Sequence, residues 1–87
     1  MAYYVRVYYV YILQCTDGTL YTGITTDLNR RLKEHKSGVG GSFTRSKKVE
    51  KIAYSEESMS RSDALKREAE IKRWKRDKKL ELINRSQ

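Results

Sequence analysis

The sequence contains no proline, one cysteine (Cys15) and one histidine (His35). A single cysteine cannot form an intramolecular disulfide, and together with one histidine it cannot supply the four ligands of a structural zinc site. The longest apolar run, residues 7–15, is too short to span a bilayer and lacks the basic start and small-residue cleavage site of a signal peptide. We therefore expect a cytoplasmic protein under reducing conditions, with no membrane segment.

The chain is short and basic. Its 87 residues suit one small domain, which we expect to span residues 1–87 with a core of about 7–84, and they are too few to enclose a deep cofactor chamber. Nineteen Lys and Arg residues against eleven Asp and Glu give a net charge of +8, of which +6 lies after residue 43. This excess favours a polyanionic partner such as nucleic acid.

The first half of the chain predicts a β-hairpin. Residues 7–13 are β-branched, aromatic or apolar at both odd and even positions, which is typical of a central strand covered on both faces. Asp17-Gly18 favours a tight turn, and residues 20–25 suit the returning strand. A three-residue loop, with Gly18 in the left-handed conformation, places Tyr11 opposite Gly23 and puts Tyr21 on the same face.

The remaining elements follow from caps and apolar spacing. We expect a helix at about 27–37 capped by Thr26 or Asp27, an edge strand at about 48–56, and a helix at about 62–75 capped by Ser60 or Ser62. Asp77 is the expected cap of a short last helix. The order β-β-α-β-α-α predicts an α+β domain with an antiparallel sheet packed against helices.

Glu68 interrupts an apolar helix face. At 100° per residue it falls between Ala64 and Leu65, near the middle of the stripe expected to face the core. An ionised carboxylate is costly there unless it is paired or holds a metal. Two interpretations remain: an i,i+4 ion pair with Lys72 at the core margin, or a metal-binding or acid–base role.

Three further positions depart from ordinary packing. Arg31 and His35 point to the core side of the first helix and are neighbours one turn apart, although each also fits a structural role. Gly23 is a strand glycine, where a group can approach the backbone closely. Tyr11 and Tyr21 are aligned beside it by the predicted register.

Basic residues cluster after the glycine-rich loop at 38–41 and again between residues 66 and 79, where eight occur. A solvated helix face explains many such runs, but a basic half beside an aromatic strand fits contact with phosphates better. The positions we expect to contact nucleic acid are Gly23, Arg30, Arg45, Lys47, Lys48, Lys72 and Arg73.

Taken together these residues resemble the GIY-YIG nuclease domain. Val10-Tyr11-Ile12 corresponds to its first tripeptide and Tyr21-Thr22-Gly23 to its second, while Arg31, His35 and Glu68 occupy the expected helical positions. The stretch 25–35 and the glycine-rich loop look most like its small, single-domain bacterial branch. Val10 and Thr22 depart mildly from the family tripeptides.

The resemblance implies a three-stranded antiparallel sheet flanked by helices, and hydrolysis of DNA phosphodiester bonds with one divalent ion, Mg²⁺ or Mn²⁺. It implies that Tyr11 orients or deprotonates the attacking water, that Tyr21 shapes the site and that Arg31 binds the scissile phosphate. Glu68 would hold the metal, and His35 would assist proton transfer or contact the phosphate.

Single-stranded or branched DNA, met in repair or recombination, is the expected substrate, with RNA as an open alternative. We expect no separate DNA-recognition domain in so short a chain, so specificity would come from nucleic-acid shape or from a protein partner. The alternatives are a nucleic-acid-binding module of this fold with weak catalysis, and an interaction domain whose basic face meets an acidic protein.

Overall fold

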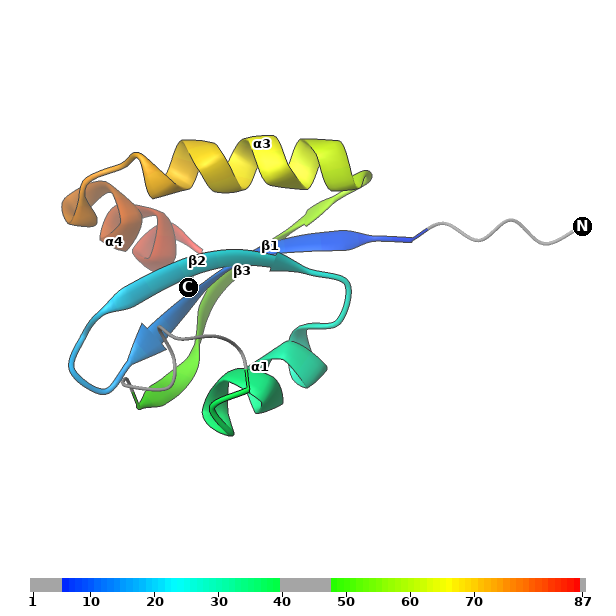
Figure 1. The fold of residues 1–87 in the computed structure, drawn as a ribbon. Coiled ribbons are helices and arrows are strands. Elements are labelled where there is room, and N and C mark those ends of the chain that lie inside the picture. The colour runs from blue at the N-terminus through cyan, green and yellow to red at the C-terminus, as the bar shows by residue number, and fades with distance from the viewer. Residues whose placement is uncertain (1–5, 40–47, 87) are drawn as a thin grey trace, which may run out of the picture.

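The computed structural model describes residues 6–39 and 48–86. Its elements are β1 (Tyr8–Cys15), β2 (Leu20–Thr25), α1 (Leu28–Lys36), β3 (Val49–Ser58), α3 (Arg61–Lys72) and α4 (Arg76–Arg85). The strands form one antiparallel sheet in the order β2-β1-β3 (Figure 1). The predicted α+β class, element order and central first strand are therefore confirmed.

The hairpin between β1 and β2 has the predicted three-residue loop. The Cys15 N–H donates to the Thr19 carbonyl at 2.9 Å, and the Gly18 N–H donates to the Cys15 carbonyl at 2.9 Å. Gly18 has φ +86°, which a residue with a side chain rarely adopts. The resulting register pairs Tyr11 with Gly23, as predicted.

Helices cover the sheet on both faces, which explains why the first strand is apolar on both parities. In Figure 1, α3 and α4 lie on one side of the sheet and α1 on the other. The core on the α3 and α4 side consists of Val10, Ile12, Ala64, Ile71 and Ile83. The core on the α1 side consists of Tyr11, Leu13, Cys15 and Val49, with Leu28 and Leu32 packed against it.

Two of the predicted helix caps are present and one is wrong. Asp27 accepts from the Arg30 N–H, and Ser60 accepts from the Asp63 N–H. Asp77 is not a cap but lies in the first turn of α4, whose N-cap position is Lys75 with no side-chain cap bond. The reason is the short connection 73–75: with Trp74 packed on the core, α4 starts one residue before Asp77.

Within residues 6–39 and 48–86, no helix is long and apolar enough to cross a membrane.

The sheet edge formed by β2 matters most for the site. In Figure 1 this strand runs in front, with α3 above it and α1 below it, so side chains from both helices can meet there.

Candidate active site

Tyr11 lies on the α1 face of the sheet, and its phenol passes over Gly23 on the neighbouring strand. The residue is only 1% exposed. A Cβ built on Gly23 would lie 2.6 Å from the Tyr11 hydroxyl and 2.8 Å from its Cζ. The close approach to this strand glycine is therefore made by Tyr11 itself, and the missing side chain leaves room for the phenol.

The Tyr11 hydroxyl meets two side chains from α1. It lies 2.9 Å from His35 Nε2, and the Arg31 Nε donates to it at 3.4 Å. Arg31 is held from its other side by Glu34, with Nη1 to Oε1 at 3.2 Å. His35 is 1% exposed, whereas the Arg31 side chain is 29% exposed. The one-turn spacing of Arg31 and His35 thus presents both groups to one phenol oxygen.

Tyr21 completes the aromatic wall around the imidazole. Its ring stands edge-on to His35, with centroids 5.4 Å apart and planes at 63°, and the Tyr11 ring approaches His35 at 6.0 Å. Tyr21 is two residues from Gly23 on β2 and so lies on the same face. The predicted grouping of the two tyrosines with Arg31 and His35 is present in the structure.

Glu68 reaches the same edge of the sheet from α3. It lies between the buried Ala64 and Ile71, and its side chain is 17% exposed. Its Oε2 is 3.4 Å from Lys72 Nζ, so the ion pair considered from the sequence is present. The carboxylate is also close enough to Tyr11 for its charge to help raise the pKa of that phenol.

Burial sets the protonation of the central pair. It raises the pKa of Tyr11 above its ordinary value of 10.0, although the Arg31 hydrogen bond and charge oppose this. Burial also lowers the pKa of His35 from its ordinary 6.5, and the Arg31 charge adds to the effect. At neutral pH the site therefore contains a neutral phenol, a neutral imidazole and a guanidinium.

Glu68 is the residue here that could hold a metal ion. The described part of the chain has no group of three or more His, Cys, Asp or Glu side chains placed to bind a metal. A single carboxylate nevertheless suits Mg²⁺, which keeps several waters and takes oxygens from phosphates. Glu68 therefore fits a one-metal site completed by water and substrate.

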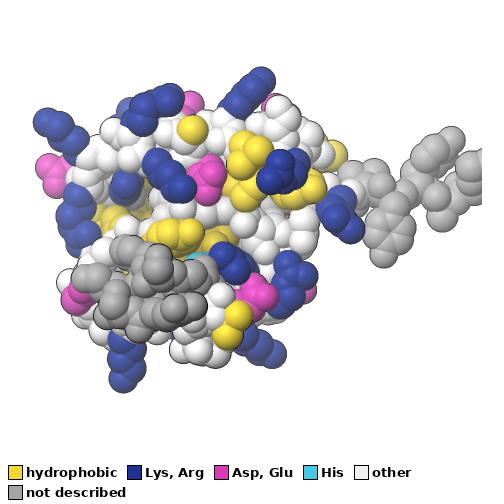
Figure 2. Space-filling model, viewed as in Figure 1, with side chains coloured by type: hydrophobic (Ala, Val, Ile, Leu, Met, Phe, Trp, Pro, Cys, Tyr) yellow, Lys and Arg dark blue, Asp and Glu magenta, His cyan; other side chains and the backbone are white. Residues whose placement is uncertain are grey.

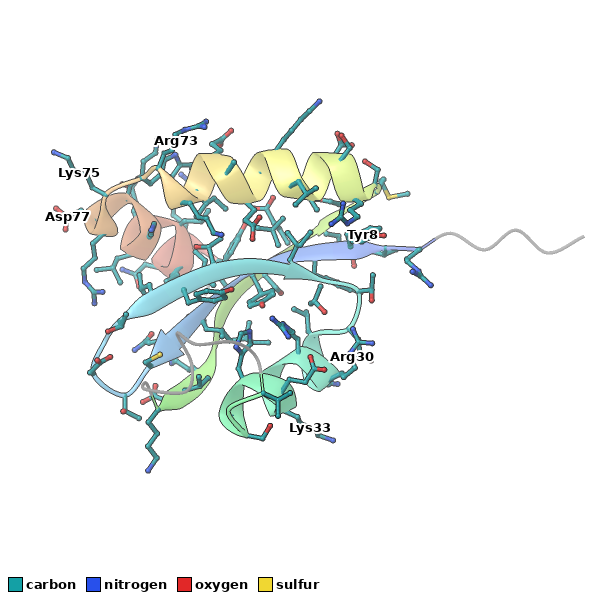
Figure 3. The ribbon with its side chains drawn as sticks, viewed as in Figure 1. Tyr8, Arg30, Lys33, Arg73, Lys75 and Asp77 are labelled. Carbon is teal, nitrogen blue, oxygen red and sulfur yellow. The ribbon has the colours of Figure 1, made fainter. Side chains whose placement is uncertain are left out.

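The predicted nucleic-acid contacts do not all lie at this edge, because Lys48 precedes β3 at the opposite edge of the sheet. Arg30, Lys48, Lys72 and Arg73 are exposed, while Gly23 is buried beneath Tyr11. In Figure 3, Arg30 lies on α1 and Arg73 beyond the end of α3, on opposite sides of β2. Figure 2 shows Lys and Arg side chains around the same face with apolar groups between them. Arg45 and Lys47 lie outside the described residues.

One partner of the site and one contact beside it were missed from the sequence. Glu34 holds Arg31, and its i,i+3 spacing on α1 is a signal that could have found it. Arg67, next to Glu68, turns instead to β3 and bonds both carboxylate oxygens of Glu56 at 3.1 Å. This contact joins strands and helices far apart in sequence, so no local spacing reveals it.

The fold and this constellation define a class of protein. A family model described as the GIY-YIG catalytic domain matches residues 7–81. The chain therefore belongs to the GIY-YIG family, as the resemblance implied.

Its relatives are small bacterial proteins. The UPF0213 protein SSP2268 of Staphylococcus saprophyticus is 43% identical over 77 residues, covering 88% of this chain and 94% of that protein. A UPF0213 protein of Staphylococcus aureus is 45% identical over 76 residues, covering 87% and 93%. The solution NMR structure of the UPF0213 protein BH0048 from Bacillus halodurans is 41% identical with a TM-score of 0.57, covering 90% of this chain and 83% of that one.

Proposed function

We propose that the protein is a divalent-metal-dependent endonuclease that hydrolyses phosphodiester bonds in single-stranded or branched DNA. The observation that carries the proposal is the meeting of Arg31 and His35 on the Tyr11 hydroxyl, with Glu68 within electrostatic reach. Packing of the Tyr11 ring does not require its hydroxyl to bond both a guanidinium and an imidazole, so this arrangement favours a chemical role. Membership of the GIY-YIG family supports a nuclease-type activity on nucleic acid.

The hydrogen-bond donors set a direction for proton transfer. Arg31 can only donate, so the Tyr11 oxygen accepts from it. With the His35 proton on Nδ1, the tautomer that the proposal requires, the Tyr11 O–H donates to Nε2. When water attacks phosphorus, its proton passes to the Tyr11 oxygen while the Tyr11 proton passes to the neutral Nε2. The bond to the leaving oxygen breaks and that oxygen takes a proton from solvent. Tyr11 thereby acts as a base although its own pKa is high.

The charged groups have separate tasks. Arg31 faces the scissile phosphate, whose non-bridging oxygens gain charge during attack, and Tyr21 holds the imidazole edge-on in place. Glu68 would hold Mg²⁺ or Mn²⁺, which would supply further charge neutralisation at the phosphate. Arg30, Lys48 and Arg73 would bind the flanking strand. Repair or recombination in the cytoplasm, with a protein partner adding specificity, is the setting we propose.

The test uses matched charge changes. Single-stranded, flapped and branched DNA would be incubated with Mg²⁺ or Mn²⁺ and the wild type, Arg31→Ala or Glu68→Gln. The matched controls are Lys33→Ala and Glu57→Gln, exposed residues on α1 and β3. We expect metal-dependent cleavage that is lost in the two site variants and kept in both controls. No cleavage by the wild type on any substrate would contradict the proposal.

A second candidate function, a nucleic-acid-binding module with weak catalysis, is favoured by the Glu68–Lys72 ion pair. A carboxylate already paired with an ammonium group has less need of a metal. Salt-sensitive DNA binding with no cleavage in any sample would select this function. Binding that persists in Arg31→Ala while cleavage is lost would select the nuclease.

A further inference from the structure

A second basic feature lies away from the Tyr11 site, at the hairpin end of the molecule. A cleft of about 520 Å³ opens between the β1–β2 turn and α4. Its lining residues are Asp17, Gly18, Thr19, Leu20, Arg76 and Lys79. In Figure 1 the start of α4 and this turn lie on the same side of the molecule, at the start of β2. Arg76 and Lys79 belong to the basic stretch 66–79, but none of the lining residues was among the individual positions predicted to contact nucleic acid.

The Arg76 side chain is held at the cleft by a hydrogen bond to the β1–β2 turn. Its Nη1 donates to the Gly18 carbonyl at 2.7 Å, and its Nη2 would lie 3.4 Å from a Cβ on Gly18. This bond uses one of the five N–H groups of the guanidinium and holds the group beside the turn, which leaves four donors for a ligand. The left-handed Gly18 is therefore matched to a positioned cation, and Lys79, one turn further along α4, adds a second.

The acidic group in the cleft is turned toward its own loop. Asp17 Oδ1 accepts from the Thr19 N–H at 2.9 Å, which stabilises the turn. Arg76 and Lys79 carry two positive charges and Asp17 one negative charge, so the cleft has a net positive charge. Planar guanidinium and ammonium donors together suit a phosphate group.

The cleft and the candidate active site lie along the same strand. Leu20 lines the cleft and packs on the α3 and α4 side of the sheet, whereas Gly23 lies beneath the Tyr11 hydroxyl on the α1 side. The two residues are three positions apart on the edge strand β2, about 10 Å at the rise of a β-strand. One DNA strand that crosses this edge is therefore long enough to contact both places.

We infer that the Arg76–Lys79 cleft binds a backbone phosphate of the nucleic-acid strand held at the Tyr11 site. The inference rests on the proposed function for the identity of its ligand. It makes the β2 edge a track for the substrate, with the Tyr11 site partway along and the cleft at the hairpin end.

The experiment measures binding without divalent metal, so that it does not depend on cleavage. Fluorescence anisotropy with a labelled DNA hairpin at several salt concentrations would compare the wild type, Lys79→Gln and Arg76→Gln. Lys51→Gln is the matched control, because it removes the same charge from β3, the opposite sheet edge. Lys79→Gln carries the test, since Arg76 also holds the turn.

We expect Lys79→Gln to weaken binding several-fold and to reduce the slope of log K against log salt by about 0.7–0.9, the effect of one phosphate contact. In ¹⁵N NMR titrations the hairpin DNA should shift the Gly18 and Thr19 amides together with the Gly23 amide. In Lys79→Gln the Gly23 shift should remain while the other two decline.

Two results would overturn the inference: Lys79→Gln that matches Lys51→Gln in affinity and salt slope, or inorganic phosphate that saturates the Gly18 and Thr19 shifts at lower concentration than the DNA. The second result would identify a free-anion site. A protein that binds DNA as expected but cleaves none under any metal condition would contradict the nuclease function and support the cleft.

Discussion

Replacing Gly23 by Ala should disrupt the site by displacing one side chain. The new Cβ would lie 2.6 Å from the Tyr11 hydroxyl, whereas ordinary contact begins at 3.4 Å, so the phenol must move by about 0.8 Å. Tyr11 has little freedom to move, because it is 1% exposed and its hydroxyl is 2.9 Å from His35 Nε2. Gly23 is not in the left-handed region, so its backbone accepts Ala.

The magnitude follows from two opposing effects. Overpacking a buried contact costs about 1–3 kcal/mol, and replacing a strand glycine by Ala recovers roughly 0.5–1 kcal/mol. We expect a net loss of about 1–2 kcal/mol, which lowers the Tm of a domain of this size by roughly 5–15 °C. A displacement near 1 Å at the reacting group should reduce single-turnover cleavage by about 100-fold.

Urea unfolding followed by circular dichroism and single-turnover cleavage would check both effects. Ser55→Ala is the matched control, because Ser55 pairs with Tyr11 on the other side of β1 and is exposed. Gly23→Ala should cost much less in a Tyr11→Leu background than in the wild type, since Leu removes the clashing ring. A Gly23→Ala protein as stable as the wild type, with no coupling to Tyr11→Leu, would refute the reasoning.

Three further predictions concern charge and pH. Burial lowers the pKa of His35 from 6.5, so at mildly acidic pH the unfolded chain takes up a proton that the folded chain does not. The free energy of unfolding should therefore fall as pH drops from 7.5 to 5.5. Urea titrations should show a weaker pH dependence of this free energy for His35→Gln than for the wild type, and identical pH dependence in both proteins would contradict the prediction. Because the proposed relay needs a neutral imidazole and a neutral phenol, and burial lowers the pKa of His35 below 6.5 and raises that of Tyr11 above 10.0, single-turnover cleavage should be level between pH 7 and 9. A rate that still increases at pH 9 would contradict the relay. Lys72→Gln, which removes the half-exposed ammonium group, should strengthen Mn²⁺ binding about two- to fivefold as measured by electron paramagnetic resonance, which is the scale of a surface ion pair. Glu68→Gln should abolish Mn²⁺ binding. Equal Mn²⁺ affinities in the wild type and both variants would contradict Glu68 as the ligand.

The hairpin and its register could be predicted because local rules determine them. Asp17-Gly18 locates the turn, and the three-residue loop predicted for it pairs Tyr11 with Gly23. Helical spacing brings Arg31 beside His35. The start of α4 could not be predicted in the same way. Asp77 is a good cap by composition, but the packing of Trp74 determines where that helix begins.

The contacts missed from the sequence are those between distant elements. Arg67 and Glu56 are eleven residues apart on different elements, and Arg76 meets Gly18 across 58 positions. No periodicity within one helix predicts which basic residue turns to which strand. The aromatic and charged residues of the site were found because each breaks a local pattern, whereas Arg76 and Lys79 lie within an ordinary basic run.

Tyr11 belongs at once to the core under α1 and to the candidate active site. Its ring contributes to the packing that docks α1, and its hydroxyl depends on the two side chains that α1 carries. A shift of this helix would therefore change stability and chemistry together. Natural variants that loosen α1 but keep the chemistry should be rare, because loosening the helix also breaks the proposed proton path.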